Sequence, residues 1–213
     1  MPDNEVYTLS ATATEVFVGG DFNSLNSQLR SNIAALNPIN GALLSWDAEL
    51  IGTSVSTLIA TPSLLYIGGD FSFVGGQMRD YAAALDPNTA LANAWDPKPS
   101  SPVNVLAFSP SATVVYLGGT FGMINGTSRP NLAAVSATGA GALQPFNATL
   151  TANSVDAIVV DSSGFVYFGG DFTQVGGQAR SSLAMVDSTG GVQTWNPGGC
   201  GVSGYVRALA IQS

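Results

Sequence analysis

Leu65-Tyr66-Ile67-Gly68-Gly69-Asp70 is a short apolar run that ends in a glycine pair, and the chain contains three close copies of it. The copies are Val16-Phe17-Val18-Gly19-Gly20-Asp21, Val115-Tyr116-Leu117-Gly118-Gly119-Thr120 and Tyr167-Phe168-Gly169-Gly170-Asp171. The residue after the glycine pair recurs after 49, 50 and 51 residues. A fixed period of this size predicts a repeat architecture. A repeat describes how a surface is built, whereas an activity has to be argued from a site on that surface.

Each repeat contains apolar runs of strand length separated by turn signals, which predicts four antiparallel strands. First strands are expected at 6–10, 55–60, 103–108 and 155–160, and third strands at 32–36, 81–85, 131–135 and 182–186; the second strands carry Gly-Gly. The fourth strands end at an aromatic residue, namely Trp46, Trp95, Phe146 and Trp195. Pairs such as Gly75-Gly76 and Asn125-Gly126 predict tight hairpin turns between the second and third strands, because these residues tolerate positive φ.

Four antiparallel strands in a repeat of about 50 residues predict an all-β propeller of four-stranded, kelch-like blades. The stretches 66–79 and 167–180 both contain Gly-Gly-Asp-Phe, then Val-Gly-Gly-Gln and an arginine. This string resembles the bacterial β-propeller repeats of unknown function. Kelch repeats are a relative, although kelch usually has tyrosine in the third strand where this chain has Ala35, Ala84, Ala134 and Ala184. The resemblance implies an exported or cell-surface propeller and attaches no activity to it.

We expect one propeller over residues 1–213, or a part of a larger one, with blades at about 5–50, 51–100, 101–151 and 152–200. Residues 205–213 then read as an extra first strand. Because both ends of the chain offer the same kind of strand, no simple ring closure is available. Three explanations stay open: a piece of a propeller of about six to eight blades, a half-ring that self-associates, and a four-bladed ring with a spare strand. The first is favoured because the sequence stops within a repeat without a polar cap.

Charged residues are scarce, at 9% of the chain, and 14 acidic residues against 6 basic ones give a net charge of −8. A phosphate backbone would be repelled, so nucleic acid is not expected as a partner. Lys98 is the only lysine, so the sequence has no polybasic patch for anionic lipid. It also lacks an apolar run of about 18 residues, which argues against membrane insertion.

Four arginines stand nine residues after the position that follows Gly-Gly: Arg30, Arg79, Arg129 and Arg180. That position is Asp21, Asp70 and Asp171 in three repeats and Thr120 in the third. In a chain this poor in charge, the spacing predicts internal contacts between aspartate and arginine. Because this arrangement recurs in every repeat, we interpret the contacts as structural. The aromatic residues of the fourth strands are likewise expected in the core between blades, with sugar stacking as the alternative.

Catalytic and metal-binding residues are poorly represented. The chain has no histidine, the most common general base and metal ligand, and Cys200 is its only cysteine, interpreted as an incidental thiol. No catalytic residue, metal ligand or cofactor is predicted. Asn125 and Asn147 each open an Asn-x-Thr sequon, which predicts glycosylation if the protein passes through a glycosylating secretory path.

These observations favour a non-catalytic extracellular or cell-surface module that binds protein or polysaccharide, or that assembles on a surface by self-association. The alternative is a carboxylate-based hydrolase or lyase that acts on glycans, which requires two acids about 5–10 Å apart. An enzyme should show a cluster of acids found in one repeat alone. The third repeat, with Thr120, Arg129-Pro130 and Phe146, diverges most and is the first place to search.

Overall fold

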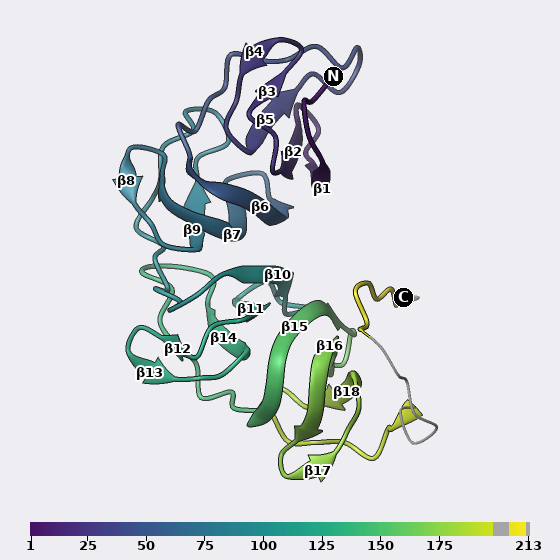
Figure 1. The fold of residues 1–213 in the computed structure, drawn as a ribbon. Helices are drawn as coiled ribbons and strands as arrows, with labels where there is room; N and C mark the ends of the chain where they lie inside the picture. Colours follow the sequence, from purple (N-terminus) through teal and green to yellow (C-terminus); the bar gives the residue numbers. More distant parts are fainter. Residues whose placement is uncertain (198–204, 212–213) are drawn as a thin grey trace. The chain divides into compact units, whose positions relative to one another are not determined.

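The computed structural model describes residues 1–197 and 205–211 (Figure 1). Its regular structure is entirely antiparallel β-sheet, and no α-helix occurs among these residues. The chain divides into two compact halves, Met1–Lys98 and Pro99–Ser213, and each half holds two of the predicted repeats. In the described part of the chain, no helix is long and apolar enough to cross a membrane.

Repeats 1 and 2 make up the N-terminal half. Repeat 1 consists of β1 (Val6–Ala11), β2 (Val16–Gly20) and β5 (Ile33–Leu36), in the order β1-β2-β5, with a small hairpin of β3 (Ser24–Leu25) and β4 (Gln28–Leu29). Repeat 2 consists of β6 (Ile51–Ala60), β7 (Leu65–Val74), β8 (Gln77–Met78) and β9 (Ala82–Leu85), with β7 paired to the other three. The predicted first, second and third strands of both repeats are confirmed.

Repeats 3 and 4 make up the C-terminal half and have the same strand order. Repeat 3 consists of β10 (Val103–Phe108), β11 (Val114–Gly119) and β14 (Leu132–Ser136), with a hairpin of β12 (Met123–Ile124) and β13 (Thr127–Ser128). Repeat 4 consists of β15 (Leu150–Val160), β16 (Val166–Val175), β17 (Gln178–Ala179) and β18 (Leu183–Val186). The four repeats are therefore copies of one antiparallel unit.

The hairpin turns adopt the backbone conformation expected from their residues. Both central residues have positive φ in every repeat, for example 59° and 78° at Gly75 and Gly76, and 45° and 74° at Asn125 and Gly126. Glycine and asparagine adopt this left-handed conformation at low cost, and it matches the twist of the two strands that the turn connects. The prediction of two-residue hairpin turns is confirmed.

The predicted fourth strand does not form as a strand. In each repeat the segment after the third strand keeps one isolated bridge to it: Leu36 with Leu43, Leu85 with Ala92, Val135 with Leu143, and Val186 with Val192. In each repeat an arginine side chain binds a backbone carbonyl of this segment, as described below. The sheets of repeats 1 and 3 therefore have three strands, and in repeats 2 and 4 the fourth strand is the two-residue strand β8 or β17 and not the predicted one.

The glycine pair is explained by two close approaches of the chain. A Cβ at the second glycine would collide with the backbone of the repeat's own first strand, as at Gly119 against the carbonyl of Pro102. A Cβ at the first glycine would meet a valine of the following repeat: at Gly19 it would lie 2.8 Å from Val55 Cγ1, and at Gly118 it would lie 2.7 Å from Val155 Cγ1. Within each half, the motif therefore joins one repeat to the next and needs glycine at both positions.

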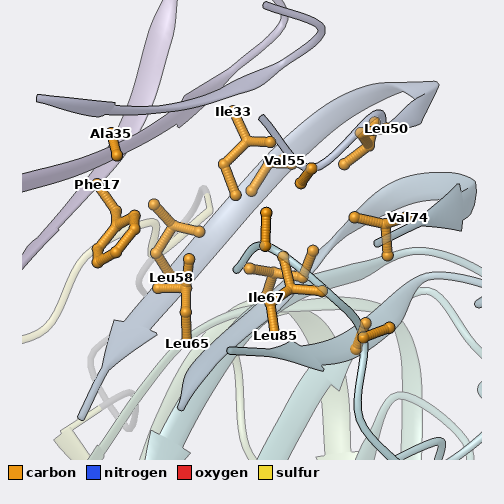
Figure 2. Close-up of a cluster of buried hydrophobic side chains, with 14 of the residues drawn as sticks. Phe17, Ile33, Ala35, Leu50, Val55, Leu58, Leu65, Ile67, Val74 and Leu85 are labelled. Atoms are coloured by element: carbon orange, nitrogen blue, oxygen red, sulfur yellow. The ribbon is translucent and has the colours of Figure 1, made fainter. Parts of the chain in front are cut away.

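The core lies between neighbouring repeats within each half. In the N-terminal half, Phe17, Ile33 and Ala35 of repeat 1 belong to the same buried cluster as Leu58 and Ile67 of repeat 2 (Figure 2). A cluster of the same kind joins repeats 3 and 4. Burying a large apolar side chain contributes about 1.5–3 kcal/mol, so stacking of repeats is the main source of stability.

Residues 205–211 do not form the extra strand expected at 205–213, and residues 212–213 lie outside the described part. Val206 nevertheless contacts Gly169 in the way that Val55 contacts Gly19. The segment therefore takes the place of a first strand without its hydrogen-bonded ladder.

Candidate functional site

The four arginines bind backbone carbonyls. In repeats 1, 2 and 4, one terminal guanidinium nitrogen donates to the residue just before the arginine, and the other donates to the segment after the third strand. The second acceptor is Leu44 O for Arg30 (2.9 Å), Asn93 O for Arg79 (2.7 Å) and Gln193 O for Arg180 (2.9 Å), while Arg129 Nε donates to Phe146 O (3.1 Å). The carboxylates near these arginines follow the tryptophan of the same repeat: Asp47 lies 3.5 Å from Arg30, and Asp96 lies 3.9 Å from Arg79.

The aspartates after Gly-Gly accept hydrogen bonds from groups near the first strand, so their predicted pairing with the arginines is wrong. Asp21 accepts a hydrogen bond from the amide of Glu5 (2.9 Å), Asp70 from Thr53 Oγ1 (2.8 Å) and Asp171 from Asn153 Nδ2 (2.6 Å). In repeat 3, Thr120 Oγ1 donates to Pro102 O (3.5 Å). Each of these side chains follows the glycine pair directly and ties this part of the repeat to the beginning of the first strand, whereas the arginine lies beyond the hairpin and reaches the last segment of the repeat.

The aromatic residues at the end of each repeat pack edge-on against an aromatic residue of the second strand. The pairs are Phe17–Trp46, Tyr66–Trp95, Tyr116–Phe146 and Tyr167–Trp195, with ring centroids 5.2–5.3 Å apart. Such T-shaped contacts stabilise by about 0.5–1.5 kcal/mol beyond the buried area. Trp46, Trp95 and Phe146 are buried, as expected of core residues, but Trp195 is 38% exposed and is not a core residue here.

The two sequon asparagines are exposed, and Asn125 occupies the first position of the β12–β13 turn. Glycosylation at Asn125 and Asn147 stays a prediction. Cys200 lies outside the described residues. Of the sequence-predicted site residues in the described part of the chain, the aromatics Trp46 and Phe146 line a groove described below, and the others do not.

A groove in the C-terminal half lies between repeats 3 and 4 and has a volume of about 460 Å³. Its walls are three turns, at 109–113, 162–164 and 188–189, together with residues 144–146. We call it the C-terminal groove. Seven of its lining side chains are hydroxyl-bearing serines and threonines from these turns, Gln144 adds an amide, and buried Tyr116 and Phe146 form part of its floor. No charged residue is found among the described residues that line it.

Hydroxyl groups of this groove remain available to a ligand. Ser111 and Thr113 are linked to each other, with their oxygens 2.8 Å apart, and Thr189 donates to Asp187 (2.6 Å). The exposed hydroxyls of Ser162 and Ser188 make no hydrogen bond within the described part of the chain. A hydroxyl both donates and accepts, so it matches a ligand that is itself rich in hydroxyls.

Two groups in or beside the C-terminal groove have shifted pKa values. Burial raises the pKa of the Tyr116 phenol, which keeps it protonated at neutral pH. Hydrogen bonds from the Thr189 hydroxyl and then from backbone amides lower the pKa of Asp187, which holds the turn at 187–191 from just outside the groove. Neither group is prepared to exchange a proton with a ligand near pH 7.

The equivalent position between repeats 1 and 2, in the N-terminal half, holds two adjoining hollows of about 370 and 390 Å³ that share Glu15, Pro87 and Asn88. We call them together the N-terminal groove. It differs in charge, because Glu15 and Asp47 both line one of the hollows beside Trp46. The Glu15 carboxylate accepts hydrogen bonds from Thr12 (3.0 Å) and Thr14 (2.6 Å), and Asp47 lies against Arg30.

Sequence reasoning missed both grooves, although it named repeat 3 as the place to search. Of the residues that make repeat 3 divergent, Phe146 lines the C-terminal groove, whereas Thr120 and Arg129 do not. The sequence feature that could have located the C-terminal groove is the pair of serine-rich turns at 109–113 and 162–163, which follow the first strands of neighbouring repeats. Among the residues that the structure describes, no group of three or more His, Cys, Asp or Glu is arranged to hold a metal ion.

Comparison with known proteins supports the fold. Residues 15–43 match a family described as a domain of unknown function (DUF5122) beta-propeller. A solved gluconolactonase from Xanthomonas campestris, described as important in glucose secondary metabolic pathways, is similar over 84% of this chain and 56% of its own, with a TM-score of 0.50 and 18% identity. The fold is that of a β-propeller. This chain spans just over half the length of that neighbour, and no curated protein matches it.

Proposed function

We propose that this chain is a non-catalytic β-propeller module that binds neutral polysaccharide in the C-terminal groove. The observation that carries the proposal is the lining of that groove, which is rich in hydroxyls and lacks charge in a protein of net charge −8. Sugar hydroxyls require partners that donate and accept, which serine, threonine and glutamine side chains provide. An anionic polysaccharide would be repelled by the protein as a whole.

A binding role is favoured over catalysis in this groove because no acid or base is available there. General acid–base catalysis works best with a group whose pKa lies near the operating pH. Tyr116 is the titratable residue of the lining, and its raised pKa keeps it protonated. The groove is therefore built to hold a ligand without changing it.

We further propose that the four repeats are four kelch-like blades of a larger or self-completing ring, located outside the cell or on its surface. The support for this location is the low charge, the single lysine and the hydroxyl-rich turns. Protease treatment of intact cells from the native source, followed by immunoblotting, tests it. Loss of the protein is expected, and complete protection would contradict a surface location.

A second candidate function is hydrolysis of a glycan or a sugar lactone in the N-terminal groove. The observation in its favour is that Glu15 and Asp47 line one hollow with Trp46. Glu15 has no counterpart in the other repeats, where Leu64, Thr113 and Phe165 stand just before the second strand. The similarity to a gluconolactonase is consistent with this candidate. Against it, both carboxylates are already held by donors of their own repeat.

One experiment separates the two functions. Dextran, a soluble β-glucan, a galactan and polygalacturonate are each offered to the protein in calorimetric titrations, and the same samples are assayed for reducing ends; gluconolactone is assayed for ring opening. We expect one neutral probe to bind unchanged and polygalacturonate not to bind. Turnover that Glu15→Gln abolishes would establish the hydrolase instead, and absence of binding to every neutral probe would refute the binding proposal.

A further inference from the structure

Strand β1 exposes apolar side chains that other first strands bury. Val6 and Leu9 are 40% and 65% exposed. Their equivalents in β6, Val55 and Leu58, are 0% and 6% exposed, and those in β15, Val155 and Ile158, have the same values. The equivalence follows from register, because in these three repeats the valine pairs with the second glycine, and the residue three positions after the valine pairs with the residue before the first glycine.

The buried strands show what normally covers this face. Val55 of β6 lies against Gly19 of repeat 1, and Val155 of β15 lies against Gly118 of repeat 3. The receiving glycine leaves room for the valine, so the contact requires a glycine strand from a repeat of the same kind. Strand β1 carries the valine and the leucine of this interface, but no glycine strand from the described residues covers them.

The opposite half of the same interface lies in repeat 4. Its glycine, Gly169, is covered by Val206, and Leu209 of the same segment is half-buried. Residues 205–211 carry valine and leucine with the spacing of Val6 and Leu9, but they belong to no sheet. Repeat 4 is therefore covered by a single segment that is not part of a sheet. A complete following repeat would cover it with a strand that is already paired in a sheet.

We propose that β1 of one copy docks on repeat 4 of a second copy and takes the place of residues 205–211. The incoming strand is already paired with β2, so it loses less conformational entropy on binding than a free segment does. Docking would cover exposed Val6 and Leu9 and would continue the stacking seen within each half. The contact is head-to-tail, so it generates rings or open chains. This inference does not depend on the proposed polysaccharide binding.

Sedimentation velocity of the full 213-residue chain over a concentration series tests the proposal. We expect association that increases with concentration. Leu9→Glu should weaken it at least about tenfold, because a charge would then face the glycine strand. Ile39→Glu is the matched control, since Ile39 is 92% exposed in the turn after β5 of repeat 1, and it should associate like the unchanged protein. Thermal unfolding checks that each variant is folded.

A second variant tests the receiving face. Val206→Asp should release the segment from Gly169 and strengthen association, because β1 of the partner no longer competes with it. A protein that stays monomeric at all concentrations would overturn the proposal. So would association that Leu9→Glu leaves unchanged. Association that is lost in Leu9→Glu but insensitive to Val206→Asp would indicate a symmetric contact of β1 with β1, which also contradicts head-to-tail docking.

Discussion

The two grooves occupy equivalent places in the two halves, yet they offer different chemistry. Each is formed by the turns after the first strands of neighbouring repeats and by the segment that leads to an aromatic residue. The N-terminal groove contains Glu15 and Asp47, whereas the described lining of the C-terminal groove is uncharged.

This difference distinguishes contacts that recur in every repeat from groove residues that are found between one pair of repeats. The glycine contacts, the arginine bonds to carbonyls and the T-shaped aromatic pairs recur, so they belong to the fold. The residues of the turns vary without disturbing these contacts, because they lie outside the buried core. Function in a repeat protein is therefore best sought where equivalent turns differ.

The largest expected effect concerns the glycine pair, which both halves share. Gly119→Ala and Gly20→Ala each place a Cβ against backbone atoms of the first strand, so each should lower the free energy of unfolding by about 3 kcal/mol or more. Gly122→Ala is the control, because nothing lies within 4 Å of its Cβ position. Urea denaturation measures all three. Equal midpoints for Gly119→Ala and Gly122→Ala would refute our explanation of the glycine pair.

The next effect distinguishes the two grooves. Ser188→Glu adds a bulky charge to the C-terminal groove and should weaken binding of the neutral polysaccharide about tenfold, or by about 1.4 kcal/mol. Ala13→Glu adds the same charge to the exposed lining of the N-terminal groove and should leave binding unchanged. Calorimetric titration measures both. The opposite ranking would move the binding site to the N-terminal half.

A smaller effect concerns the turn beside the C-terminal groove. The pKa of Asp187 is lowered in the folded state, so its contribution to stability is present above the ordinary value of 3.8 and is lost as the pH falls through the folded value. Asp187→Asn should lower the Tm at neutral pH and make the Tm decline less steeply below about pH 4. Asp80→Asn, at an exposed residue, is the control. Parallel Tm curves for Asp187→Asn and the unchanged protein would contradict this account.

Much of the fold could be predicted from the sequence, because strands and tight turns leave local signals. The period of the glycine pair located three strands of each repeat, and residues such as Gly75-Gly76 located the hairpins. The predicted partner of Arg30 was wrong because its main acceptor is a backbone carbonyl, which any residue carries and which therefore leaves no sequence signal. The fourth strand was predicted from its apolar residues, but the segment keeps one isolated bridge to the third strand in each repeat.

The grooves could not be predicted because they depend on which turns meet in space. Ser111, Ser162 and Ser188 come from three separate turns, and only the stacking of repeat 4 on repeat 3 brings them to one surface. Read alone, each turn is an ordinary polar connection. The exposure of Leu9 could not be predicted either, because its sequence context is that of a buried first strand.

The most direct test of the central claim is an amide NMR titration of the intact protein with the neutral oligosaccharide that binds best. We expect shift changes confined to residues 109–113, 144–146, 162–164 and 188–189, around the C-terminal groove. Shift changes centred on residues 12–15 and 44–47, or spread over the surface without saturation, would contradict polysaccharide binding between repeats 3 and 4.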